Sequence, residues 1–140
     1  MAQAPDDAVG EVERLFREAQ RYHLGADNRP RNRRKAVELY WKVVQQDPGH
    51  ADAYYNLASL CFEQKRYDLA RKYYGRAIEL LPMDGHARNN LGVVYERQGN
   101  LRKAEQLYRR AIQIDPDVAM AHYNLARHLL RQGKTEEALA

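Results

Sequence analysis

The sequence predicts an all-α protein in which antiparallel helix pairs stack into an elongated solenoid. Two observations support this fold class. The chain repeats itself with a period of 34 residues, and fixed periods of this length are typical of repeat architectures. Each repeat also contains two stretches whose apolar residues follow the spacing of one helix face, and a proline closes the unit.

The repeat is clearest between residues 51–84 and 85–118, where ten of thirty-four positions are identical. The identical residues of the first of these units are Ala53, Asn56, Leu57, Gln64, Ala70, Tyr74, Arg76, Ala77, Ile78 and Pro82. A further unit starts at Ala119 and keeps Asn124 and Leu125. The predicted organisation is a disordered or fraying N-terminus (1–8), an irregular first repeat (9–50), two regular repeats (51–84 and 85–118) and a truncated last repeat (119–140).

Within a regular unit the two helices can be placed from the apolar pattern. The first helix carries Tyr54, Leu57, Ala58 and Cys61 at i, i+3, i+4, i+7 spacing, and the second carries Ala70, Tyr73, Tyr74, Ala77 and Ile78. The turns between them read QKRY, QGNL and QGKT, and two of these supply a glycine for a helix C-terminal cap. Small residues at positions 58, 92 and 126 let the paired helices approach closely.

The first unit departs from this pattern in its turn. We expect its first helix over residues 8–24, with Leu15, Ala19 and Tyr22 inward, followed by a turn that is five residues longer than in the other units. This turn holds the strongest charge cluster of the chain: Arg29, Arg31, Arg33, Arg34 and Lys35. The cluster is either a solvated basic surface or an anchor for an acidic partner or nucleic acid. No aromatic residue interleaves with the arginines, so stacking on bases is poorly supported and a nucleic-acid partner is not expected.

The sequence contains no recognisable catalytic constellation. Cys61 lies on the packed face of a helix, which indicates a small core residue rather than a reactive thiolate. The five histidines form no metal-binding pair, and no glycine-rich phosphate loop is present. We therefore predict a protein that is not an enzyme and uses no cofactor and no metal.

Composition sets the expected environment. The net charge is +4, which is only mildly basic, and the single cysteine excludes an internal disulfide and fits a reducing compartment. The N-terminal residues lack the pattern of a secretory signal, and no stretch is long and apolar enough for membrane insertion. These features favour a cytoplasmic location.

The repeat pattern resembles that of the tetratricopeptide repeat family. The aromatic-x-x-Leu-small-x-x-aromatic run of that family is similar to Tyr54, Leu57, Ala58 and Cys61, although Cys61 replaces an aromatic residue. The later small, aromatic, small and proline positions match Ala70, Tyr74, Ala77 and Pro82 and their counterparts one period later. The long first turn resembles that of Sel1-like repeats. The resemblance implies a right-handed superhelix in which the first helix of each pair lines a concave groove.

The resemblance also implies a protein-interaction scaffold that binds a peptide or an extended partner segment in this groove. The candidate groove residues are Tyr55, Asn56, Ser59, Asn89, Asn90, Val93, Arg97, Tyr123, Asn124, Arg127 and Arg131. The C-terminal half of this face is the more basic, so we expect an acidic or carboxylate-bearing ligand segment there. Two alternatives stay open: self-assembly into a homo-oligomer through the truncated last repeat, and a docking or regulatory arm of a larger enzyme.

Two finer expectations concern the groove asparagines. Co-chaperones of the family use a clamp of Lys, Asn, Asn, Lys and Arg for a carboxylate terminus, and only Asn90 matches one of these five positions, so we predict no clamp of that kind. Asn56, Asn90 and Asn124 repeat at one place in each unit. They either hold a peptide backbone, as the similar asparagine ladder of the O-linked N-acetylglucosamine transferase repeats implies, or bond to neighbouring helices as internal struts.

Overall fold

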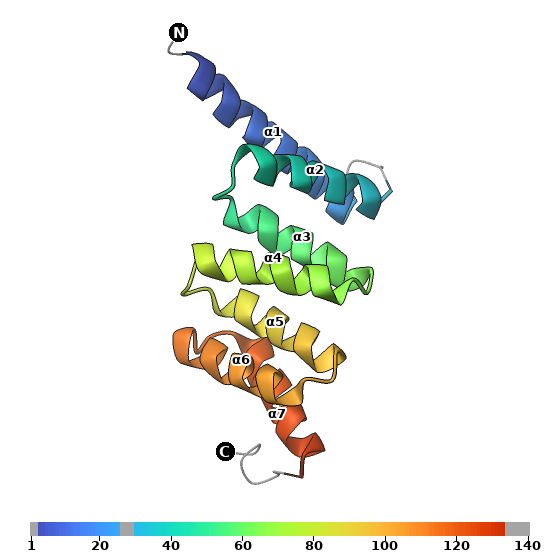
Figure 1. Ribbon diagram of the computed structural model, residues 1–140, viewed down its shortest axis with the longest axis vertical. Coiled ribbons are helices and arrows are strands. Elements are labelled where there is room, and N and C mark those ends of the chain that lie inside the picture. Colours follow the sequence, from blue (N-terminus) through green and yellow to red (C-terminus); the bar gives the residue numbers. More distant parts are fainter. Residues whose placement is uncertain (1–2, 26–29, 134–140) are drawn as a thin grey trace.

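The computed structural model describes residues 3–25 and 30–133, and within this part the chain forms seven helices and no strand (Figure 1). The helices are α1 (Gln3–Leu24), α2 (Arg33–Gln46), α3 (Ala51–Glu63), α4 (Tyr67–Leu80), α5 (Gly85–Arg97), α6 (Leu101–Ile114) and α7 (Ala119–Arg131). The predicted all-α solenoid is confirmed. Helix α1 begins at Gln3, five residues before the predicted start of the first helix.

The helices stack in pairs along the long axis of the molecule. Helices α1 and α2, α3 and α4, and α5 and α6 pack as pairs, and α7 packs on α6 (Figure 1). Helices α1 and α7 therefore lie at opposite ends of the stack. Each pair contacts mainly its neighbours along the chain, as expected for a quasi-one-dimensional repeat protein.

The core of each pair combines one buried tyrosine with small residues. Tyr40, Tyr74 and Tyr108, which are one period apart, are all buried, and a buried alanine precedes each by four residues. Glycine is required at position 92, because a Cβ atom there would lie 2.6 Å from Cε1 of Tyr108. The predicted close approach of paired helices is thus real at α5 and α6. Cys61 belongs to the same core, and burial raises the pKa of its thiol.

The turns between paired helices follow the predicted chemistry. Gly99 and Gly133 adopt positive φ values of 83° and 77°, which is the left-handed conformation expected just after a helix end. In the third such turn the same position is occupied by Lys65, whose φ is 61°. Asn100 then caps the next helix, because its side chain accepts a hydrogen bond from the backbone N–H of Lys103 at 3.2 Å.

The long basic turn of the first repeat is held against α3. Both Arg31 and Arg33 form ion pairs with the carboxylate of Glu63, the latter with 3.0 Å between Nε and Oε2. The backbone N–H of Asn32 also donates to the carbonyl of Tyr22 at 2.8 Å. Two arginines of the cluster therefore act within the fold, while Arg34 is exposed and Arg29 lies outside the described residues.

Candidate functional site

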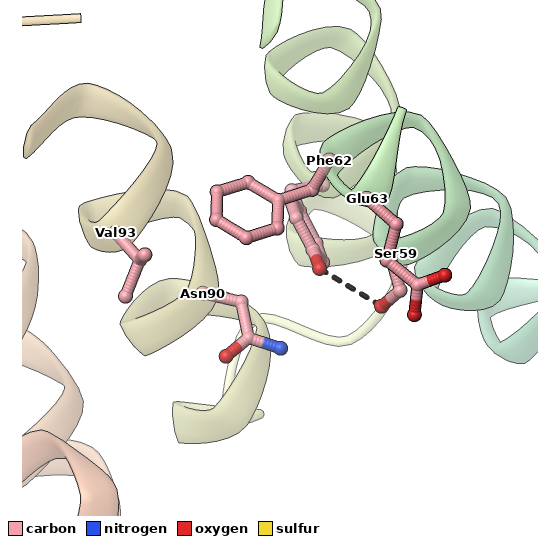
Figure 2. Close-up of a pocket in the computed structure, with 6 residues that line it drawn as sticks. Ser59, Phe62, Glu63, Asn90 and Val93 are labelled. Atoms are coloured by element: carbon pink, nitrogen blue, oxygen red, sulfur yellow. Dashed lines mark hydrogen bonds between the residues drawn. The ribbon is translucent and has the colours of Figure 1, made fainter. Parts of the chain in front are cut away.

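The first helices of consecutive repeats enclose a hollow of about 300 Å³ between α3 and α5. Figure 2 shows Ser59, Phe62 and Glu63 on one helix, across from Asn90 and Val93 on the other. The sixth lining residue is Tyr74 of α4. Phe62 and Val93 give the hollow an apolar part, while the hydroxyl, amide and carboxylate groups form its polar part. This mixture is typical of sites that take one apolar side chain and orient it by hydrogen bonds.

The polar part of the hollow is a connected set of hydrogen bonds. The hydroxyl groups of Ser59 and Tyr74 share a hydrogen bond, with 2.8 Å between the two oxygen atoms. The Ser59 hydroxyl also lies 3.1 Å from the backbone carbonyl oxygen of Tyr55, to which it can donate. Asn90 Nδ2 donates to Tyr55 Oη at 2.7 Å. Burial raises the pKa of Tyr74 to about 12 and also raises that of Tyr55. Both phenols therefore stay neutral at pH 7 and hold the surrounding side chains by hydrogen bonds.

The asparagines form a chain of amides that runs from α7 to α3. Asn124 Nδ2 donates to Asn89 Oδ1 at 2.9 Å, Asn89 Nδ2 donates to Asn90 Oδ1 at 3.2 Å, and Asn90 donates to Tyr55 as described above. The side chain of Asn56 bonds to the hydroxyl of Tyr40, where it partly offsets the rise in pKa that burial causes. This arrangement favours the interpretation of the three repeated asparagines as internal struts.

The placement of Asn89 and Asn124 corrects the sequence-based expectation. Both were expected on the groove surface, but only 4% and 2% of their surfaces are exposed. Asn124 donates to Asn89, and Asn89 donates on to Asn90, so both buried amides have hydrogen-bond partners inside the fold. The other candidate residues are accessible at least in part: Tyr55, Asn56, Ser59, Asn90, Val93 and Arg127 are half-buried, whereas Arg97, Tyr123 and Arg131 are exposed.

Glu96 compensates part of the basic half of the face. The Arg127 guanidinium donates to Glu96 Oε2, Arg131 Nη1 lies 3.8 Å from Glu96 Oε1, and Tyr108 Oη donates to Glu96 Oε2 at 3.3 Å. Only 9% of the Glu96 side chain is exposed. By contrast, Arg97 forms no ion pair with any carboxylate in the described part of the chain, and its guanidinium carbon lies 5.7 Å from the ring centroid of Phe62. Arg97 is therefore the cation of this face with unused charge.

Phe62 and Glu96, which sequence reasoning missed, occupy the same position in consecutive repeats. Likewise, Val93 and Arg127 are one period apart. The apolar pair Phe62 and Val93 lines the hollow between α3 and α5, and the ion pair of Glu96 and Arg127 joins α5 to α7 at the equivalent place. An alignment of the repeats therefore contains a signal for this difference: both apolar residues of one interface are replaced by oppositely charged residues in the next.

A comparison with protein-family models assigns the architecture. The model described as tetratricopeptide repeat matches residues 50–117 and 86–140, which together cover more than half of the chain. The chain belongs to the tetratricopeptide repeat family. A search of curated proteins finds no match.

Solved structures of tetratricopeptide repeats agree with this assignment. The structure of MamA has a TM-score of 0.80 and 29% identity, and the match covers 91% of this chain and 72% of that one. An O-GlcNAc transferase mutant from Thermobaculum terrenum has a TM-score of 0.73 and 26% identity, over 92% of this chain and 23% of that one. The first repeat domain of Spaghetti (RPAP3), solved with the HSP90 peptide SRMEEVD, shares the fold at a TM-score of 0.78 and 20% identity, over 87% of this chain and 93% of that one.

Two further searches concern the described residues only. In residues 3–25 and 30–133, no group of three or more His, Cys, Asp or Glu side chains is placed to hold a metal ion. Within the same residues, none of the helices has the length and apolarity that crossing a membrane would require.

Proposed function

We propose that this tetratricopeptide repeat chain is a protein-interaction scaffold that holds an extended segment of a partner protein along the face of α3, α5 and α7. The observation that carries the proposal is the hollow between α3 and α5. It is open to solvent, has an apolar part made by Phe62 and Val93, and has hydrogen-bonding groups of Ser59 and Asn90 beside that part. Peptide grooves of this kind bind one apolar anchor and orient the backbone around it.

The charges around the hollow favour a ligand with an acidic residue next to the apolar anchor. Arg97 is exposed beside Phe62, and its charge is not used by a carboxylate of the described residues. Glu63, which lines the same hollow, is compensated by Arg31 and Arg33. The expected acidic preference therefore centres on Arg97, because Arg127 and Arg131 already face Glu96.

The test uses peptides selected from a random library on the purified chain, followed by fluorescence anisotropy with the best binder. Val93→Arg places a long cationic side chain in the hollow and is expected to weaken binding at least about tenfold, which is the equivalent of 1.4 kcal/mol. Arg97→Ala is expected to weaken acidic peptides more than their neutral amide counterparts. Gln106→Arg, on the exposed surface of α6, adds the same charge away from the groove and serves as the matched control.

Equal affinity of the wild type and Val93→Arg for the selected peptides would remove this proposal. The circular dichroism spectrum and the urea unfolding midpoint of each variant are measured as well, so that an unfolded variant is distinguished from one that has lost only binding. A tight complex with SRMEEVD would contradict the predicted absence of a two-carboxylate clamp. The docking-arm and self-assembly alternatives stay predictions. Residues 134–140 of the last repeat lie outside the described residues.

A further inference from the structure

A second hollow lies between the second helices of two consecutive repeats and shares no residue with the groove. Its volume is about 540 Å³, and it is lined by α2 and α4 together with Tyr54 of α3. Gly75, which lies in the middle of α4, is one of the lining residues. This site does not depend on the groove proposal, because the two hollows are formed by different side chains.

Gly75 has no structural reason to be a glycine. Its φ is not positive, and a Cβ atom built on it would find nothing within 4 Å. Glycine weakens a helix interior relative to alanine. The equivalent residues one period away are Trp41 and Arg109, both large. The missing side chain at position 75 therefore keeps open a space that neighbouring repeats would fill.

Three aromatic rings form a row along this space. The ring centroids of Trp41 and Tyr73 are 6.2 Å apart, and those of Tyr73 and Tyr54 are 6.3 Å apart with 30° between the ring planes. Trp41 is 43% exposed, which is unusual for so large an apolar side chain. Exposed tryptophan and tyrosine next to a hollow are the residue types that dominate binding energy at protein interfaces.

Cations surround the aromatic row. Lys72 Nζ lies 5.9 Å from the ring centroid of Tyr73, and Arg76 Cζ lies 5.9 Å from that of Tyr54. The lining contains three cations, the third being Arg71, and one carboxylate, Glu79, which pairs with Arg76 at 3.0 Å. Among the described residues no carboxylate lies within ion-pair distance of Lys72. The hollow therefore offers aromatic faces under a net positive charge.

We propose that this hollow is a second docking site, which binds an acidic peptide segment through an aromatic side chain. The aromatic side chain of the ligand would enter the space above Gly75 and pack on Trp41 and Tyr73. Flanking carboxylates would then lie near Lys72, Arg71 and Arg76. Arg76 and Arg71 already face Glu79 and Asp68, so an apolar or basic segment would leave Lys72 without a carboxylate partner. A purely acidic segment would leave the aromatic faces uncovered.

The single tryptophan of the chain makes this site directly observable. Trp41 is the only tryptophan, so its emission reports binding at this hollow without a label. The probe is a capped Gly-Ser-flanked peptide with the core Glu-Glu-Phe-Glu-Glu, which itself contains no tryptophan. We expect a saturable change in Trp41 emission at peptide concentrations up to about 1 mM.

Gly75→Leu fills the hollow and favours the helix, so it is expected to fold at least as well as the wild type and to bind at least about tenfold more weakly. Lys72→Glu is also expected to weaken binding of this acidic peptide, because it replaces a positive charge beside the hollow by a negative one. Val93→Arg, which alters only the groove, should leave the Trp41 titration unchanged. This comparison separates the failure of this proposal from the failure of the groove proposal.

Four results would each overturn the proposal. Three of them are no saturable change with the wild type, unchanged affinity in Gly75→Leu, and equal binding of a control peptide in which Ala replaces Phe. Equal binding of a single-stranded oligonucleotide would also overturn it, because the site would then recognise negative charge alone.

Discussion

At the residue scale, Lys65 is the clearest local irregularity. It takes the left-handed conformation that its counterparts Gly99 and Gly133 adopt without cost. The left-handed conformation costs a residue with a Cβ atom about 1–2 kcal/mol. Replacing that residue by glycine removes this cost, but glycine loses more conformational freedom on folding, which costs about 0.5–1 kcal/mol. Lys65 is exposed, so its side chain contributes little packing that could offset the cost.

We therefore predict that Lys65→Gly raises the free energy of unfolding by about 0.5–1 kcal/mol. Urea denaturation followed by circular dichroism measures the change. Gln106→Gly is the matched control, because Gln106 is exposed in the interior of α6, where glycine should destabilise the chain. A lower stability of Lys65→Gly than of the wild type would contradict the assignment of strain to this residue.

At the scale of helices, consecutive repeats are joined in two different ways. Between α3 and α5 the facing positions hold Phe62 and Val93 and leave a hollow. Between α5 and α7 the equivalent positions hold Glu96 and Arg127, which bond to each other and to Tyr108. The same solenoid step thus holds an apolar-lined hollow in one repeat and an ionic bridge in the next.

A double-mutant cycle tests this ionic bridge. Glu96→Phe and Arg127→Val each leave one partner charge poorly compensated, and we expect each to destabilise the chain by about 1–3 kcal/mol. The double variant has the apolar pair of the preceding repeat. We expect its loss in the free energy of unfolding to be smaller than the sum of the two single losses by at least about 1 kcal/mol. Strict additivity in urea denaturation would show that the two side chains do not act as a pair.

At the scale of the whole molecule, the amide chain connects the repeats. Asn124, Asn89 and Asn90 link α7 to α5, and Asn90 continues to Tyr55 of α3. Because a repeat protein is stabilised largely by the interfaces between neighbouring units, hydrogen bonds that cross these interfaces affect the cooperativity of the entire stack. The asparagine positions that recur with the 34-residue period thus have a structural role that does not require a ligand.

The variant Asn56→Ala/Asn90→Ala/Asn124→Ala tests this role. It removes about one hydrogen bond at each step, so we expect a loss of about 2–4 kcal/mol in the free energy of unfolding. Because Asn90 also lines the hollow, the affinity for a groove peptide should fall by no more than one hydrogen bond, which is less than about tenfold or about 1.4 kcal/mol. Gln45→Ala/Gln106→Ala, at exposed positions, is the control. Unchanged stability together with lost affinity would instead assign the asparagines to the ligand.

The sequence by itself determined the helix pairs, their order and most of the core. These features depend on local rules: helical spacing places Leu57, Ala58 and Cys61 on one face, and glycine after a helix end marks a turn wherever it occurs. A 34-residue period then implies stacking, because a single helix pair cannot bury its apolar face alone. The face of the hollow was also predictable, since Ser59, Asn90 and Val93 were among the expected groove residues.

Only the tertiary structure decided what each polar side chain of that face meets. Helical spacing gives the angle of a side chain around its own axis, but the neighbouring helix decides whether that direction leads to solvent or to a partner. Asn89 and Asn124 are therefore buried against each other, and Arg127 forms an ion pair with Glu96. All four side chains nevertheless lie on the predicted groove face or beside it. The hollow above Gly75 has the same origin, because it arises where Trp41 and Tyr73 come together from different repeats.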